Sequence, residues 1–256
     1  MDKLLSQIED LVRETGQILL NAKKEEKGVE EKEGRGNYVT KYDRLVENRL
    51  REELKKILPD SHFVGEEEDI HESILNHGYT FVVDPIDGTW NFAHNMDLSS
   101  ISVGLLKDGE GYIGVCYDPY RNEMFTAQKD QGAYMNGKAI HVSSLHLNNG
   151  VFCSGSAPYY QDKREETIRV HAQLFRNAND YRRSGSAVID ICDVACGRLE
   201  LFFEALLQPW DYCAGSIIVK EAGGVAQTLE GKELLFDRPC SVFIHNGMDD
   251  YLKYLI

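Results

Sequence analysis

Apolar residues in the first part of the chain recur at intervals of three and four, the spacing that places side chains on one face of a helix. In the first segment these positions are Leu4, Leu5, Ile8, Leu11, Val12, Ile18 and Leu19. We therefore predict a helix over residues 2–24. A second apolar stripe predicts a helix that begins near Thr40 and ends at Pro59, because proline stops helices. The joining residues 24–37 are rich in charge and glycine, and we expect a mobile loop there.

Beyond the second predicted helix the apolar runs are short and end at turn-forming residues, which indicates strands. The predicted strands cover residues 62–68, 79–87, 100–106, 111–118, 123–128 and 132–140. Turn signals at Asp108-Gly109, Tyr120-Arg121 and Asn136-Gly137 join the later ones into a meander.

After residue 150 the predicted strands and helices alternate. Strands are expected at residues 150–155, 180–185, 199–204 and 241–246, and helices at 163–175, 186–197 and 210–224, with a short helix at the C-terminus. This alternation predicts a layered α/β fold. We place a boundary near residues 148–150, and so expect one domain over residues 1–256, built of two lobes at about 1–147 and 148–256.

The composition is that of an acidic globular protein. The 256 residues include 28 Lys and Arg against 42 Asp and Glu, a formal net charge of −14. An acidic surface disfavours nucleic acids and anionic membranes, since both are polyanions. The N-terminal segment carries acids between its apolar residues, unlike a secretion signal, and no apolar run is long enough to span a bilayer. We therefore expect a cytoplasmic protein with neither nucleic acid nor membrane as partner.

The cysteines show no CxxC pair and stand mostly in apolar stretches. They are Cys116, Cys153, Cys192, Cys196, Cys213 and Cys240. This pattern favours reduced, buried thiols over disulfides or a zinc site.

The nonapeptide DPIDGTWNF (residues 84–92) carries the clearest chemical signal. An apolar run leads to Asp84, Pro85 prevents the strand from continuing, and Gly88 permits a sharp turn. Asp84 and Asp87 should therefore project close together from a strand end. Two ionised carboxylates so near each other repel, and a divalent cation with oxygen ligands compensates for that repulsion. The Ile86 carbonyl between them is a candidate third ligand.

The same motif offers a binding place for phosphate. The backbone N–H groups of Gly88 and Thr89 stand at an expected helix start, where anions bind. The alternative is a turn whose aspartates only cap a helix. That alternative would suffice for an Asp-Gly pair, but it does not account for the whole nonapeptide.

Acids at three further places in the chain are candidates for the same site. The run GEEE (residues 65–68) follows a short apolar strand and, by itself, could be a solvated turn. Asp211 in PWDYCAG stands at the start of an apolar helix and could simply cap it. Asp43 lies one turn into the second predicted helix, where its interaction with the helix dipole is an adequate explanation. Acids at three strand ends nevertheless predict one cation cluster at the carboxyl edge of a sheet.

In combination the motifs GEE, DPIDGTWNF and WDYCAGSIIVKEAGG resemble the inositol monophosphatase family of metal-dependent, lithium-sensitive phosphatases, in the family's order and over most of the chain. The resemblance implies the αβαβα sandwich of these sugar phosphatases as a single catalytic domain. Many members are homodimers, so a homodimer is expected here.

The resemblance also implies roles for individual residues. The Mg²⁺ ligands would be Glu66, Asp84, the Ile86 carbonyl, Asp87 and Asp211, with Glu67 in support. Asp43 and Thr89 would orient and deprotonate the attacking water, and the Gly88 and Thr89 amides would bind phosphate. The pocket for the substrate alcohol would be lined by Gly185, Ser186, Ala187 and Glu204. Residues 24–37 correspond to a region that shapes a third metal site, which Lys32 or Arg35 could reach.

The implied reaction is hydrolysis of a small phosphorylated alcohol with two or three Mg²⁺ ions. A water whose pKa is lowered by bound metal attacks phosphorus in line, and Asp43 through Thr89 helps to take its proton. Inositol monophosphate is the first candidate substrate, because the NF ending of DPIDGTWNF is closer to the inositol type than to the nucleotide type. Fructose 1,6-bisphosphate, a nucleotide 3′-phosphate and histidinol phosphate are alternatives.

Two further questions stay open at this level. Arg182 and Arg183 precede the Ser-Gly-Ser-Ala turn and could contact a second phosphate of a bisphosphate substrate, or form structural salt bridges. A non-catalytic metal-binding regulator would keep the same fold. The presence of every motif acid and of Thr89 disfavours that interpretation.

Overall fold

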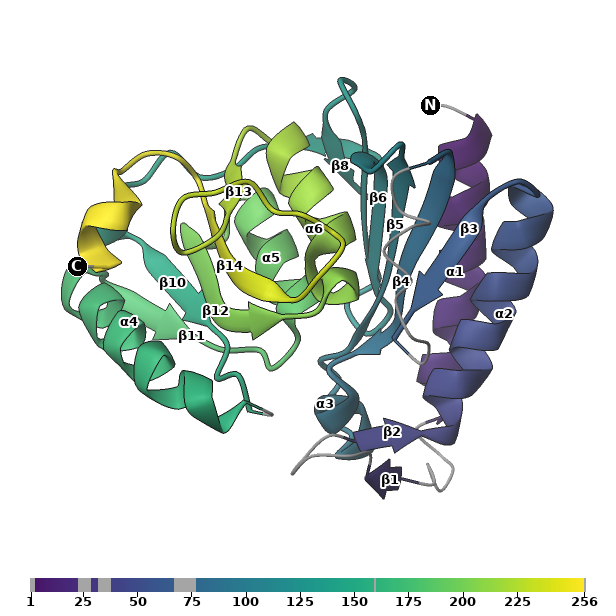
Figure 1. Ribbon diagram of the computed structural model, residues 1–256, viewed down its shortest axis with the longest axis horizontal. Coiled ribbons are helices and arrows are strands. Elements are labelled where there is room, and N and C mark those ends of the chain that lie inside the picture. The colour runs from purple at the N-terminus through teal and green to yellow at the C-terminus, as the bar shows by residue number, and fades with distance from the viewer. Residues whose placement is uncertain (1–2, 23–28, 32–37, 67–76, 159, 256) are drawn as a thin grey trace.

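The computed structural model describes residues 3–22, 29–31, 38–66, 77–158 and 160–255. Two helices open the chain, α1 (Lys3–Ala22) and α2 (Lys41–Ile57), and they pack side by side on one face of a large sheet (Figure 1). The apolar stripe of each helix is buried against that sheet, as its spacing predicts. The two helices form the first layer of the molecule.

The large sheet has seven strands whose spatial order follows the chain. They are β3 (His62–Gly65), β4 (Tyr79–Asp87), β5 (Ser100–Lys107), β6 (Glu110–Asp118), β7 (Glu123–Gln128), β8 (Ala133–Met135) and β9 (Lys138–Ile140). Strands β3 and β4 are parallel, and every later pair is antiparallel. The expected meander is therefore present. Its tight turns have positive φ at Asp108, Gly109, Asn136 and Gly137, which Asn, Asp and Gly tolerate best.

A second sheet has five strands in the order β11-β10-β12-β14-β13. They are β10 (Val151–Ser154), β11 (Asp180–Arg182), β12 (Leu201–Leu207), β13 (Val225–Gln227) and β14 (Cys240–His245). Strands β11, β10 and β12 run parallel, so their carboxyl ends lie at one edge.

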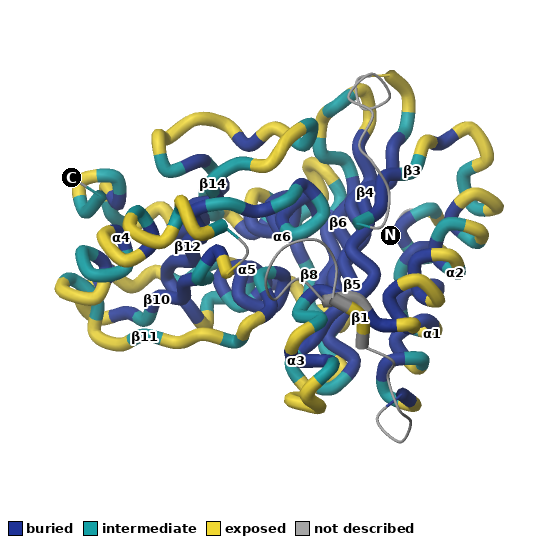
Figure 2. Tube along the Cα trace, turned by 60° about the horizontal axis from the view of Figure 1, so that its bottom comes forward, coloured by how far each residue is buried: buried dark blue, intermediate teal, exposed yellow. Residues whose placement is uncertain are grey.

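Helices complete the layers. Helices α5 (Ala187–Ala195) and α6 (Pro209–Glu221) lie between the two sheets, and α4 (Arg164–Asn177) covers the outer face of the second (Figure 1). The order helix, sheet, helix, sheet, helix is the predicted αβαβα sandwich. The middle helices and most strands are buried, while exposed residues collect on the outer helices, on turns and on the edge strand β11 (Figure 2).

The structure corrects the expectation that Pro85 ends its strand. Strand β4 continues through Pro85 to Asp87, and its register to β5 shifts between Asp84 and Asp87. Two residues of β4, Pro85 and Ile86, lie opposite the single β5 residue Ile101. This two-against-one arrangement is a β-bulge, where one residue is left out of the ladder. The missing N–H of proline is therefore accommodated without ending the strand.

Three short strands were not predicted. Within residues 24–40, strands β1 (Val29–Glu31) and β2 (Tyr38–Thr40) pair antiparallel, where we expected only a polar loop before the second helix. Strand β13 at the edge of the second sheet was also missed. The rest of the 24–37 segment, with Lys32 and Arg35, lies outside the described residues.

Other expectations can be compared directly. The cysteines are free thiols, and Cys116, Cys153, Cys192 and Cys213 are buried. In the part of the chain that the structure describes, no helix is both long and apolar enough to cross a membrane.

Candidate metal centre

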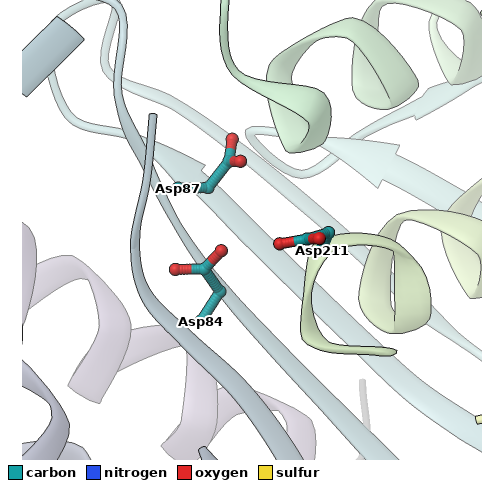
Figure 3. Close-up of side chains that lie close together, drawn as sticks. All are labelled: Asp84, Asp87 and Asp211. Carbon is teal, nitrogen blue, oxygen red and sulfur yellow. The ribbon is translucent and has the colours of Figure 1, made fainter. Parts of the chain in front are cut away.

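Three aspartates face a common space in the interior of the molecule (Figure 3). Asp84 and Asp87 project from the bulged end of β4, and Asp211 projects from the first turn of α6. One carboxylate oxygen from each lies within 4.8 Å of the other two. The predicted cluster is thus present, but it does not sit on one sheet edge as expected. Asp211 follows a strand of the second sheet, so the site lies between the first sheet and a middle helix.

Glu66 and the Ile86 carbonyl belong to the same region. Parallel pairing of Gly65 with Val83 sets Glu66 beside Asp84, because each residue directly follows its paired neighbour. Glu66 and Ile86 line one cleft with the three aspartates. Glu67 lies outside the described residues.

Burial and mutual repulsion act on these acids together. Burial and then the charge of Glu66 raise the pKa of Asp84 well above its ordinary value. Burial and then the charge of Asp87 do the same for the pKa of Asp211. Carboxylates held this closely are stable in their ionised form only beside positive charge. Their oxygen donors suit a hard divalent cation, so the residues fit a Mg²⁺-type site.

Asp87 is anchored by the start of helix α5. The hydroxyl of Ser186, the N-cap residue, donates to Asp87 Oδ2. The backbone N–H of Ala187 donates to Oδ1 at 3.2 Å and that of Val188 to Oδ2 at 3.1 Å. Burial raises the pKa of Asp87 to about 6, although these hydrogen bonds oppose the rise. Ser186 and Ala187, expected to line the alcohol pocket, therefore also position a predicted metal ligand.

Asp43 and Thr89 are in contact, although 46 positions separate them. The Thr89 hydroxyl lies 3.1 Å from Asp43 Oδ1 and 3.0 Å from the Ile86 carbonyl oxygen. The other Asp43 oxygen, Oδ2, accepts the Thr40 N–H at 2.7 Å and the Thr40 hydroxyl at 2.6 Å. Asp43 is buried behind Thr89, so Thr89 alone of the pair lines the cleft.

The short helix α3 (Thr89–Ala93) begins at this point, as predicted. Gly88 has φ of 80°, a left-handed conformation that favours glycine. The Asn91 side chain donates to the Leu98 carbonyl at 2.7 Å and to the Ser184 carbonyl at 3.0 Å. These bonds tie the start of α3 to the loop that precedes α5, which holds Gly185.

The structure brings together the predicted site residues that it describes. Those lining the cleft are Glu66, Asp84, Ile86, Asp87, Gly88, Thr89, Gly185, Ser186, Ala187, Glu204 and Asp211. Glu204 is buried, and burial raises its pKa to about 7.

Sequence reasoning missed one buried acid of the cleft. Asp190 on α5 is 3% exposed, and burial raises its pKa to about 7. Its carboxylate accepts the backbone N–H of Ser184 at 3.3 Å. The available signal was an acid on the apolar face of a helix otherwise rich in Val, Ile and Cys.

The comparisons with known proteins agree with this geometry. The Inositol monophosphatase family matches residues 1–252. The Nus factor SuhB of Xylella fastidiosa is 36% identical over 200 residues, covering 78% of this chain and 72% of that protein. Inositol monophosphatase 2 of Solanum lycopersicum is 34% identical over 240 residues, covering 91% of this chain and 90% of that protein.

A solved structure extends the likeness to the whole fold. The IMPase of Thermotoga maritima superimposes with a TM-score of 0.88 at 32% identity, covering 100% of this chain and 97% of that one. Motifs, fold and acidic cluster lead to the same conclusion: the chain belongs to the inositol monophosphatase family.

Proposed function

We propose that this protein is a Mg²⁺-dependent phosphomonoesterase that hydrolyses a small sugar or inositol phosphate, with inositol monophosphate as the first candidate. The observation that carries the proposal is the cluster of Asp84, Asp87 and Asp211 beside the Asp43–Thr89 pair. Membership of the family supports it, as does the name of the Solanum relative. Fructose 1,6-bisphosphate, a nucleotide 3′-phosphate and histidinol phosphate are the alternative substrates.

In this proposal Glu66, Asp84, the Ile86 carbonyl, Asp87 and Asp211 hold two or three Mg²⁺ ions. Bound Mg²⁺ would polarise the phosphoryl oxygens and make a water easier to deprotonate. The cation would also offset the charge of an acidic cleft that otherwise repels phosphate.

The protein's own groups then place and move a proton. Because Asp43 Oδ2 already accepts two hydrogen bonds from Thr40, Oδ1 is the atom that faces Thr89. A water beside Thr89 can pass its proton to the Thr89 oxygen as the hydroxyl proton moves to Oδ1. The Gly88 and Thr89 amides would bind the phosphate, and Glu204 would accept a hydrogen bond from the alcohol.

The test is phosphate release with and without Mg²⁺ from inositol 1-phosphate, fructose 1,6-bisphosphate, adenosine 3′,5′-bisphosphate and histidinol phosphate. Asp87→Asn should abolish Mg²⁺-dependent release, whereas Asp60→Asn, a change at an exposed acid, should retain it. The preferred compound names the substrate branch. Absence of release from all four by the folded wild type would contradict the proposal.

A second candidate function comes from the relatives named Nus factor SuhB. The prediction that nucleic acids are not partners is therefore not supported by these relatives. We propose for this role that it does not require phosphate release, so Asp87→Asn should replace SuhB in a strain lacking it as well as wild type does. Failure of both proteins in that assay would count against this candidate.

We also propose that the protein acts in the cytoplasm as a homodimer, with lobes at about 1–147 and 148–256 forming one catalytic domain.

A further inference from the structure

Part of the cleft is lined by residues at the carboxyl ends of three parallel strands, β11, β10 and β12. Cys153 of β10 pairs with Arg182 of β11, and Ser154 of β10 pairs with Phe203 of β12. The residues that follow each pair therefore lie side by side. This places Arg183 beside Ser154, and Gly155 beside Glu204, at the ends of the three strands.

Glu204 reaches across the end of β10 because Gly155 has no side chain. A Cβ on Gly155 would overlap the Glu204 carboxylate, so no other residue fits there without movement. The backbone N–H of Ala157 donates to Glu204 Oε1 at 2.9 Å and fixes the carboxylate there. The charge of Arg183 acts on Glu204 and partly opposes the rise of its pKa that burial causes.

The two adjacent arginines have different surroundings. Arg182 donates to Asp180 at 2.5 Å and to the Tyr181 carbonyl at 2.8 Å, outside the cleft. Arg183 lines the cleft, where its Nη2 donates to the Ser156 hydroxyl at 2.9 Å. Among the described residues that line the cleft, Arg183 is the single Lys or Arg, against six acids: Glu66, Asp84, Asp87, Asp190, Glu204 and Asp211.

We propose that Arg183 is a specificity-determining residue that binds a second anionic group, a phosphate or carboxylate, on the alcohol part of the substrate. The proposal rests on the phosphatase function proposed above. A second anion would be repelled by the acids of this cleft unless a cation met it. A guanidinium presents five N–H donors in a geometry that matches phosphate and carboxylate, and the bond to Ser156 uses one of them. The Ser156 hydroxyl accepts from Arg183, so its own proton can be donated to the same group.

The experiment compares two substrates that differ only in the second phosphate, fructose 1-phosphate and fructose 1,6-bisphosphate. The value of kcat/KM is measured with Mg²⁺ for wild type, Arg183→Gln, Arg183→Lys and the control Arg182→Gln. Arg183→Gln should lower the ratio of bisphosphate to monophosphate kcat/KM roughly 10- to 100-fold, the range for a lost charge-assisted hydrogen bond. The loss should fall mainly on KM for the bisphosphate. Arg183→Lys should recover part of the ratio, and Arg182→Gln should leave it within about twofold of wild type.

If Arg183 had only a structural role, Arg183→Gln would lower kcat/KM for both substrates alike and leave their ratio unchanged. That result would overturn the proposal. An equal fall of the ratio in Arg182→Gln would also overturn it. Phosphate release from inositol 1-phosphate by wild type separates the two proposals. If wild type releases this phosphate but Arg183→Gln leaves the ratio of bisphosphate to monophosphate kcat/KM unchanged, only the specificity proposal fails. If folded wild type releases phosphate from none of these three compounds, and from neither adenosine 3′,5′-bisphosphate nor histidinol phosphate, the function and the specificity proposal fail together.

Discussion

Buried acids give the cleft its chemistry at the scale of single residues. Asp84, Asp87 and Asp211 lie close enough to repel one another, whereas Asp190 lies on α5 outside that cluster. The three clustered aspartates suit a bound cation, which would offset their repulsion. The isolated Asp190 is instead favoured in its protonated form by burial. The two kinds should therefore respond differently to pH and to metal.

We expect Asp190 to make the folded protein less stable as pH rises. Its pKa is about 7 in the folded state and near 4 in an unfolded chain, so between these values the folded state holds a proton that the unfolded state has lost. The contribution is full below about pH 4 and is lost as pH rises through about 7, at about 1.4 kcal/mol for each unit of pKa difference. Asp190→Asn should weaken the fall in unfolding free energy between about pH 4.5 and 7.5, measured by urea unfolding in EDTA. Asp60→Asn should show the same decrease in unfolding free energy as wild type. An equal decrease in wild type, Asp190→Asn and Asp60→Asn would contradict the raised pKa of Asp190.

Helix starts place the acids at the scale of elements. Asp43 bonds to Thr40 at the start of α2, Asp211 accepts the Gln208 N–H at 2.8 Å at the start of α6, and Asp87 accepts the first amides of α5. Unpaired N–H groups and the helix dipole favour a carboxylate at such positions. Capping and metal binding are thus compatible, because the two oxygens of a carboxylate together offer about four lone-pair sites.

Substitution of Ser186 tests whether one group serves both the helix start and the candidate metal site. Ser186→Ala removes both the N-cap of α5 and a hydrogen bond to Asp87. We expect a loss of about 0.5–2 kcal/mol in unfolding free energy, and a higher Mg²⁺ concentration for half-maximal phosphate release. Ser186→Thr keeps the hydroxyl and should retain most of both. A normal Mg²⁺ requirement in a destabilised Ser186→Ala protein would show that the hydroxyl serves the helix alone.

At the scale of the whole molecule, the candidate metal site joins parts of the fold that are distant in the chain. Asp84 and Asp87 belong to the first sheet, and Asp211 belongs to the helix layer between the sheets (Figure 3). A cation shared among them should hold these layers together, since anything that binds only the folded state stabilises it.

Mg²⁺ should therefore raise the thermal midpoint of wild type. At a concentration of about 100 times its Kd the gain is about 2.7 kcal/mol, or roughly 5–10 °C for a chain of this size. Asp211→Asn should keep its metal-free midpoint, because it removes a repelled charge and retains an acceptor for Gln208, but it should gain much less from Mg²⁺. Differential scanning calorimetry with EDTA or Mg²⁺ measures both, and an equal gain in the two proteins would exclude Asp211 as a ligand.

Local pattern was sufficient for much of the molecule. The helical stripes, the meander turns and the layered fold follow from periodicity and turn chemistry, which act between near neighbours in the chain. The acids of the DPIDGTWNF motif were recognisable because Pro85 and Gly88 indicate a strand end and a sharp turn, which would bring Asp84 and Asp87 close together. Strands β1, β2 and β13 were missed because the charged, glycine-rich segment 24–37 indicated a loop and the Gly223-Gly224 pair indicated only a helix end.

Only the tertiary structure decided which side chains of the site contact one another. The sequence by itself determined that acids stand at strand ends and helix starts, and that the chain folds in alternating layers. It did not determine that Asp211 approaches β4 from the middle layer, that Ser186 binds Asp87, or that Asp190 and Arg183 enter the same cleft. These contacts join residues about a hundred positions apart, and they depend on how two sheets pack around α5 and α6. Packing of that kind is a property of whole surfaces, and no local run of residues encodes it.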